Sequence, residues 1–396
     1  MQPRVTAILV AHEGAQFLDR TLQALAAQTR RPDQVVAVDL GSRDGSAALL
    51  AASDPTRMVQ APARMTFGQA VDQAVRVIPA PEGDHELLWL LSADNAPAPD
   101  ALERLLAAIE ASPSVAVAGP KLMEWDHPGY IHELGTTLTT LGAAVPVVDV
   151  ELDQAQYDDM SDVLGVAAGG MLVRHRLWDE LGGFDDALPV IDDALDLCVR
   201  ARLAGHRVVV VPAARVASAG DAAPGTAFLG KRTPRRRRRR LRRQAQLHRR
   251  LVYAPPAAVP FHWLSLVPLA ILRALLQMLR KRPTAAPGEI RAARDGPTRG
   301  SVSSCSAVAV LRSSGADGLA APPAAPGAPD VAGTAGASPC RGTTSCSPSE
   351  RTRARLTPAV SAPSAKPCAA ARASTTRLPG ARGYSPGETT APTTCT

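Results

Sequence analysis

Acidic residues that could do chemistry stand at the predicted strand ends of this 396-residue chain. They are Asp39, Asp94, and the cluster Asp192, Asp193 and Asp196. Open α/β sheets bind ligands beyond the carboxyl ends of their strands, so we expect the three sites on one sheet edge. Three carboxylates there suit transfer from a nucleotide diphosphate sugar: one for the nucleoside, one for a metal on the diphosphate, one as general base. For any single Asp, turn chemistry explains the position equally well.

The elements that must position these residues alternate along the first half of the chain. Apolar, strand-like runs occupy residues 4–12, 34–42, 86–94 and 115–123. Helical spacing of apolar residues occupies 14–29, 67–78 and 98–112. This alternation predicts an α/β fold, a mostly parallel sheet with helices on both faces. The helix at 98–112 is expected to begin at Asp100, with Glu103 completing a capping box.

The pattern loosens after residue 123 into predicted loops and short antiparallel strands. Order returns with a strand at 170–174, helices at 176–181 and 193–204, and a strand at 208–211. Glycines directly follow both helices, as is common at helix C-termini.

Four stretches resemble family 2 glycosyltransferases of the GT-A fold. They are "VTAILVAHEGAQFLDRTLQALAAQTRRPDQVVAVDLGSRDGS", "LLSADNAPAPDAL", "GGMLVRHRLWDELGGFDDALP" and "DDALDLCVRARLAGHRVVVVPAARV". They lie between residues 4 and about 218, and their order and spacing make the resemblance specific. The resemblance implies an inverting nucleotide-diphospho-sugar transferase that uses Mg²⁺ or Mn²⁺. It also implies a glycan or lipid-linked acceptor for cell-envelope polysaccharide.

The resemblance assigns the donor site to the ends of the first two strands. Ala11, His12 and Asp39 fall where family members bind the nucleotide, and Leu40 replaces the second acid of the usual pair. Asp44 is expected to shape the turn before the next helix rather than to bind the donor.

The metal motif of the family coincides with Ser92, Ala93 and Asp94, where Ser92 replaces the first acid. Asp94 alone is expected to hold Mg²⁺ or Mn²⁺, because these ions often use one or two carboxylates and take other oxygens from phosphate and water. Asn95 is expected to be a turn residue.

The catalytic base is assigned by the resemblance to Asp193, with the adjacent Asp192 as a possible substitute. Ala194 replaces the second acid of the family motif, and Ser218 stands where a metal-reaching His is common. Asp196 precedes an arginine by four residues, so a helix ion pair explains it as well as catalysis does.

Two functions therefore stay open. The first is an active glycosyltransferase with a weak or absent metal, in which backbone amides and Arg or Lys bind the diphosphate. The alternative is a catalytically impaired sugar-nucleotide-binding or scaffold protein at the membrane.

We expect residues 1–230 to form the catalytic domain. Basic residues are concentrated directly after it. The chain has 44 Lys and Arg against 37 Asp and Glu, and Arg235 to Arg243 is the densest run. Phe261 to Leu279 is rich in Leu but interrupted, so it suits a helix lying in a membrane interface rather than a spanning helix. We therefore expect residues 231–290 to bind an anionic surface at the cytoplasmic face of the plasma membrane. Nucleic acid is the less favoured partner of the arginine run.

Residues 291–396 form a tail of Ala, Ser, Thr, Pro, Gly and Arg. Such a segment buries too little apolar area to fold, so we expect it to be disordered. Its abrupt composition fits a shifted reading frame. Cysteines concentrate in this tail without zinc-like spacing and no signal peptide opens the chain, which together favour a reducing, cytoplasmic compartment.

Overall fold

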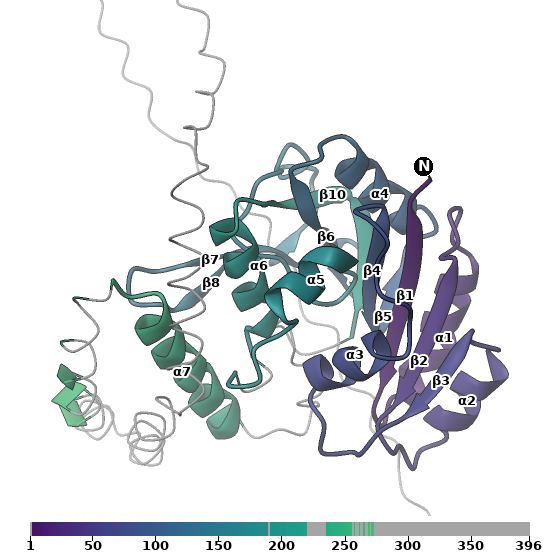
Figure 1. Ribbon diagram of the computed structural model, residues 1–396, viewed down its shortest axis with the longest axis horizontal. Coiled ribbons are helices and arrows are strands. Elements are labelled where there is room, and N and C mark those ends of the chain that lie inside the picture. Colours follow the sequence, from purple (N-terminus) through teal and green to yellow (C-terminus); the bar gives the residue numbers. More distant parts are fainter. Residues whose placement is uncertain are drawn as a thin grey trace, which may run out of the picture. The chain divides into compact units, whose positions relative to one another are not determined.

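The computed structural model describes residues 2–188, 191–219 and 235–255, with residues 257, 261, 264–265, 268–269 and 271–272. These residues fold around a ten-stranded sheet (Figure 1). The strands are β1 (Arg4–Ala11), β2 (Gln34–Asp39), β3 (Arg57–Gln60), β4 (Glu86–Ser92), β5 (Asn95–Pro97), β6 (Val115–Glu124), β7 (Tyr130–Leu138), β8 (Ala144–Leu152), β9 (Leu172–Arg174) and β10 (Arg207–Ser218). The helices are α1 (Ala15–Ala26), α2 (Ser46–Ala52), α3 (Phe67–Val75), α4 (Ala101–Glu110), α5 (His175–Leu181), α6 (Asp193–Leu203) and α7 (Arg235–Val252).

One half of the sheet consists of parallel strands in the order β3-β2-β1-β4. In the register of β1 with β2, Ala11 lies opposite Asp39. In the register of β1 with β4, Val10 lies opposite Ser92. The carboxyl ends of these three strands therefore lie side by side.

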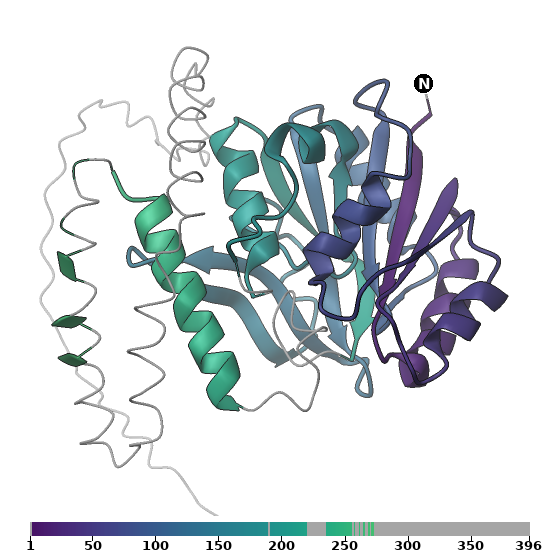
Figure 2. The same cartoon turned by 60° about the horizontal axis from the view of Figure 1, so that its bottom comes forward.

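Helices cover both faces of this sheet, because the strands carry apolar side chains on both sides. Ile8, Val10 and their neighbours pack with α3, α5 and α6. Leu9, Trp89 and their neighbours pack with α1, α2 and α4. Figures 1 and 2 show the two helical layers. The predicted α/β fold is confirmed.

The other half of the sheet is mixed. β9 lies between β4 and β6 and runs antiparallel to both, whereas β10 runs parallel to β6. β7 and β8 form a hairpin beside β6, so the antiparallel strands predicted after residue 123 are confirmed. β5 pairs with the end of β10 and sets Asn95 opposite Ser218.

The capping box lies on a different helix from the one predicted. Asp100 precedes α4 but makes no side-chain cap, and Glu103 accepts a hydrogen bond from Thr29 Oγ1 at 2.7 Å instead. A capping box is present at the N-terminus of α3. Thr66 Oγ1 accepts a hydrogen bond from the Gln69 amide, and the Gln69 side chain accepts one from the Thr66 amide, both at 3.2 Å. The capping box predicted at Asp100 was wrong because Thr29, in the loop after α1, supplies the partner for Glu103.

α7 carries the arginine run, and its second half packs on the folded domain. Its buried positions include Leu241, Ala245, Arg249 and Val252, which recur at helical spacing. No helix of the described residues is long and apolar enough to cross a bilayer. Most of 261–279 and the whole tail 291–396 lie outside the described residues, so the predictions made for them, and the domain boundaries at 230 and 290, stay predictions.

Candidate functional site

The ends of β1 and β2 bring the predicted nucleotide-binding residues together. The buried Ala11 accepts a hydrogen bond from the Leu40 amide at 2.9 Å. His12 donates from ring Nδ1 to the Leu40 carbonyl oxygen at 3.0 Å, which orients the imidazole. Asp39 is 1% exposed, and both of its carboxylate oxygens lie 3.3 Å from the Ser42 amide. The His12 ring after β1 and the Asp39 carboxylate at the end of β2 are therefore both held in place at this sheet edge.

The Asp44 side chain accepts hydrogen bonds from the N-termini of two helices. Its carboxylate accepts from the Ala15 amide at 2.9 Å, at the start of α1, and from the Ser46 amide at 3.1 Å, at the start of α2. Gly45, which lies between Asp44 and Ser46 in the chain, has a φ of 95°, a backbone conformation that favours glycine. The turn role predicted for Asp44 is confirmed.

A buried polar cluster lies just beyond the end of β4. The Ser92 hydroxyl contacts Asp94 Oδ1 and, at 2.8 Å, Asn95 Oδ1. The Ser92 amide also donates to Asn95 Oδ1 at 3.0 Å. Asn95 Nδ2 donates in turn to the Ser218 hydroxyl at 3.4 Å. Ser92 and Ser218, two positions at which the sequence was expected to depart from the motifs that it resembles, are thus parts of one network.

The sheet register sets the span of this edge. Asp39 ends β2 and Asp94 follows β4, on either side of β1. Neighbouring strands are about 4.8 Å apart, so the two strand ends are about 10 Å apart. A nucleotide diphosphate could therefore contact both, with its base end at Asp39 and its phosphates at Asp94.

The polar cluster offers a metal ion one carboxylate. The described residues contain no group of three or more His, Cys, Asp or Glu side chains that could hold a metal. Asp94 Oδ1 is also engaged by Ser92. The donor set therefore fits Mg²⁺ or Mn²⁺ through Asp94 when the diphosphate supplies further oxygens, and it does not form a protein-only cage.

The second acidic group lies at the start of α6, so the helix predicted over 193–204 is confirmed, whereas the strand-end position predicted for these acids was wrong. Asp192 precedes α6 with a φ of 63°, and Asp193 is the first residue of the helix. Burial raises the pKa of Asp193 to about 7, opposed by the Ala194 amide at 2.8 Å and helped by the negative charge of Asp192. The strand-end position was wrong because β9, the strand before these acids, ends at Arg174, and α5 lies between that strand and α6.

α7 and Tyr253, the residue that follows it, make three polar contacts with this acidic group and with Asp185 in the loop before it. Arg249 Nη2 donates to Asp192 Oδ2 at 2.8 Å, with the arginine side chain fully buried. His248 Nε2 lies 3.1 Å from Asp185 Oδ2. The Tyr253 hydroxyl donates to Asp196, which also pairs with an arginine four residues on. The ion-pair explanation of Asp196 is confirmed, and none of these α7 contacts was predicted.

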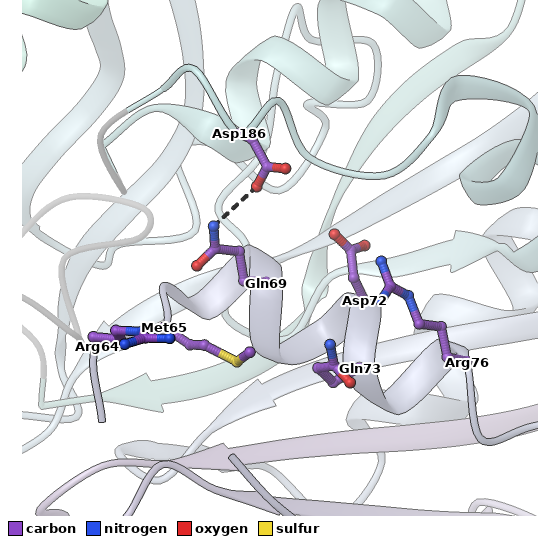
Figure 3. A pocket seen from close by; sticks show the side chains of 7 residues that line it. All are labelled: Arg64, Met65, Gln69, Asp72, Gln73, Arg76 and Asp186. Atoms are coloured by element: carbon purple, nitrogen blue, oxygen red, sulfur yellow. Dashed lines mark hydrogen bonds between the residues drawn. The ribbon is translucent and has the colours of Figure 1, made fainter. Parts of the chain in front are cut away.

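A polar pocket of about 470 Å³ lies beside this region, between α3 and the loop that leads to α6 (Figure 3). Gln69 Nε2 donates to Asp186 Oδ1 across it at 3.2 Å. Burial raises the pKa of Asp72 to about 6, with a further contribution from the charge of Asp186 and an opposing one from Arg76. Figure 3 shows Asp72 and Arg76 on the same side of α3.

Sequence reasoning missed Arg249 and the pocket for different reasons. Arg249 belongs to an arginine-rich segment interpreted as a surface anchor, although the helical spacing from Leu241 and Ala245 places it on the buried stripe. The pocket joins Asp72 and Asp186, which are far apart in the chain, and no local pattern signals such a pair.

The model of the family described as glycosyltransferase like family 2 matches residues 3–253, a range that contains the strand-end residues, the acidic group and α7. The chain belongs to glycosyltransferase family 2. As a member it has the GT-A α/β fold and is a glycosyltransferase acting on a nucleotide-sugar donor.

The similar proteins share little sequence identity with this chain. The N-acetylglucosaminyl-diphospho-decaprenol L-rhamnosyltransferase of Mycobacterium tuberculosis is 25% identical over 228 residues, 53% of this chain and 74% of that protein. The mannosyltransferase PcManGT from Pyrobaculum calidifontis, in complex with GDP-Man and Mn²⁺, is 18% identical with a TM-score of 0.42, over 80% of each chain. TarS 1–349 of S. aureus, in complex with UDP-GlcNAc, is 12% identical with a TM-score of 0.47, over 80% of this chain and 92% of that one.

Proposed function

We propose that this glycosyltransferase moves a sugar, with inversion, from a nucleotide diphosphate donor to a glycan or lipid-linked acceptor used in cell-envelope polysaccharide. The observation that carries the proposal is the environment of Asp193. Its pKa, raised to about 7 by burial, lies close to neutral pH, where a general base is both substantially ionised and basic enough to accept a proton. Asp192 lies next to it with its charge balanced by Arg249.

The residues divide the work as follows. Ala11, His12 and Asp39 bind the nucleoside end of the donor, and Asp94 lies toward the diphosphate. Asp193 takes the proton of the acceptor hydroxyl while that oxygen bonds to the anomeric carbon. The bond from that carbon to the phosphate oxygen breaks, and its electron pair leaves with the nucleoside diphosphate. Attack opposite the leaving group inverts the anomeric centre.

The leaving diphosphate carries negative charge that must be stabilised. Mg²⁺ or Mn²⁺ held by Asp94 would supply positive charge there. Arg249 is a second source: it is buried beside Asp192, and its Nη1 has no hydrogen-bond partner within the described part of the chain. Arg249 therefore supports the hypothesis that basic side chains replace part of a weakened metal site.

The acceptor and the location are also proposed. The mycobacterial relative is named as acting on a diphospho-decaprenol, a lipid-linked acceptor. α7 supplies exposed Arg236, Arg237, Arg239 and Arg242, which suit an anionic membrane surface. Together they support transfer to a lipid-linked acceptor at the cytoplasmic face of the plasma membrane.

The test is donor binding and turnover by the full chain. Calorimetric titration with UDP, GDP and dTDP sugars, with and without Mn²⁺, should show binding of at least one donor. Release of the nucleoside diphosphate with a lipid-linked acceptor mixture should follow. Absence of binding to every donor would refute the proposal.

A second candidate is a catalytically impaired sugar-nucleotide-binding or scaffold protein. Ser92, Ala194 and Ser218 favour it. The two serines join through Asn95 in a hydrogen-bond network that contains one carboxylate, Asp94. In that case the unmodified chain binds a donor but does not turn it over. The triple variant Ser92→Asp, Ala194→Asp, Ser218→His should then gain donor hydrolysis. Turnover by the unmodified chain excludes this candidate.

A further inference from the structure

The β7–β8 hairpin exposes an unusual number of large apolar side chains. The exposed residues are Tyr130, Leu141, Val145, Val147, Val150 and Leu152. Over the rest of the described residues 2–188 and 191–219, Val77 is the other large apolar side chain exposed to this degree. Apolar residues gathered in this way mark interaction sites more often than isolated ones do.

The hairpin also ends the sheet. Among the described strands β8 pairs with β7 alone, so its outer edge carries backbone groups without a strand partner. Natural edge strands usually carry charged side chains that prevent pairing with another chain. In the half of β8 nearer the tip, the exposed Val145 and Val147 flank Pro146, so this part of the edge is apolar, and the exposed acid Glu151 lies in the far half of the strand.

α7 meets the tip of this hairpin. Gln246 Nε2 donates to the Leu141 carbonyl oxygen at 3.2 Å, and Arg249 Nε donates to the Gly142 carbonyl oxygen at 3.1 Å. In Figure 2 the hairpin reaches α7. The helix contains ten arginines and no acidic residue in the sequence RRRRRRLRRQAQLHRRLV. An exposed apolar tip therefore adjoins a strongly cationic helix.

We propose that the β7–β8 hairpin is a second membrane-contacting element, which inserts Leu141, Val145 and Val147 into the interface of an anionic bilayer beside the arginines of α7. A lipid surface supplies both an apolar layer and anionic head groups, which is the pair of properties that this surface requires. A nucleic acid would match the arginines but not the apolar side chains. A second copy of the chain would bring two α7 helices of like charge together.

The experiment measures flotation of the full chain with vesicles of phosphatidylcholine alone or with added phosphatidylglycerol. The hairpin variant Leu141→Ser, Val145→Ser, Val147→Ser should bind the anionic vesicles about tenfold more weakly, because it loses apolar area from the interface. The matched control Val77→Ser, at an exposed apolar position away from the hairpin, should bind as the unmodified chain does. Arg236→Gln, Arg237→Gln, Arg239→Gln should weaken binding and its salt dependence.

Three results would overturn the proposal. They are unchanged binding by the hairpin variant, failure of the unmodified chain to bind anionic vesicles, and a dimer in light scattering that the hairpin substitutions dissociate. The last result would assign the hairpin to a contact between copies. A thermal unfolding transition like that of the unmodified chain shows that the hairpin variant is folded. Vesicle binding needs no sugar transfer, so it tests the hairpin separately from the proposed function.

Discussion

In the proposed mechanism the chemistry depends on Asp193. Asp193→Asn keeps the size of the side chain but removes its capacity to accept a proton. We expect transfer to fall by a factor of about 10² to 10⁴, the usual contribution of a general base. Donor affinity in calorimetry should change little, because the role proposed for Asp193 is to take the proton of the acceptor. Asp44→Asn, which alters a turn rather than the acidic group, is the control, and an equal loss there would contradict the assignment.

The pH profile follows from the pKa of about 7 for Asp193. The base is active when ionised, so transfer should rise with pH and level off above about 7. The charge of Asp192 contributes to the raised pKa, so Asp192→Asn should move the midpoint to lower pH. Initial rates at saturating donor across pH 5 to 9, roughly two units on each side of that midpoint, check both expectations. A midpoint that stays in place in Asp192→Asn would contradict the link between the two residues.

At the scale of single elements, a side chain caps the N-terminus of α3 but not that of α4. Thr66→Ala removes the capping box of α3 and should lower the free energy of unfolding by about 1 kcal/mol. Asp100→Ala at the start of α4 should change it by less than about 0.5 kcal/mol, because no cap hydrogen bond is lost. Urea unfolding of both variants distinguishes them. The reverse order would restore the prediction made from the sequence.

α7 is the element that joins the arginine segment to the acidic group. Arg249→Ala leaves the carboxylate of Asp192 without its buried cation, and we expect a loss of about 3 kcal/mol in the free energy of unfolding. Arg242→Ala, on the exposed side of the same helix, should cost less than about 0.5 kcal/mol. Chemical denaturation of the full chain measures both. Equal small effects would mean that α7 does not pack on the domain in solution.

At the scale of the whole molecule, stability should fall as the solution becomes more alkaline from about pH 4 to 7. Burial raises the pKa of Asp193 from 3.8 unfolded to about 7 folded, so the folded state binds more protons in that range. Raising the pH therefore favours unfolding, and the loss is complete above the folded pKa. Asp72, whose pKa burial raises to about 6, adds a loss of the same sign. Urea unfolding at several pH values should show a flatter dependence in Asp193→Asn.

The sequence by itself determined the α/β class, the order of strands and helices, the strand-end positions of Asp39 and Asp94, and the turn role of Asp44. These features depend on hydrophobic periodicity and on residues close together in the chain, which leave local patterns. The full length of the last strand, β10, and the partner of Glu103 did not follow, because both depend on contacts with neighbouring elements.

Tertiary structure decided the rest. The position of Arg249 on Asp192, the pairing of Asn95 with Ser218, and the buried Lys121 with Asp153 and Asp158 all join residues from separate elements. Burial is set by what the fold places nearby, and it is burial that raises the pKa of Asp193. The residue types are visible in the chain, whereas their solvation and their partners exist only once the elements have packed.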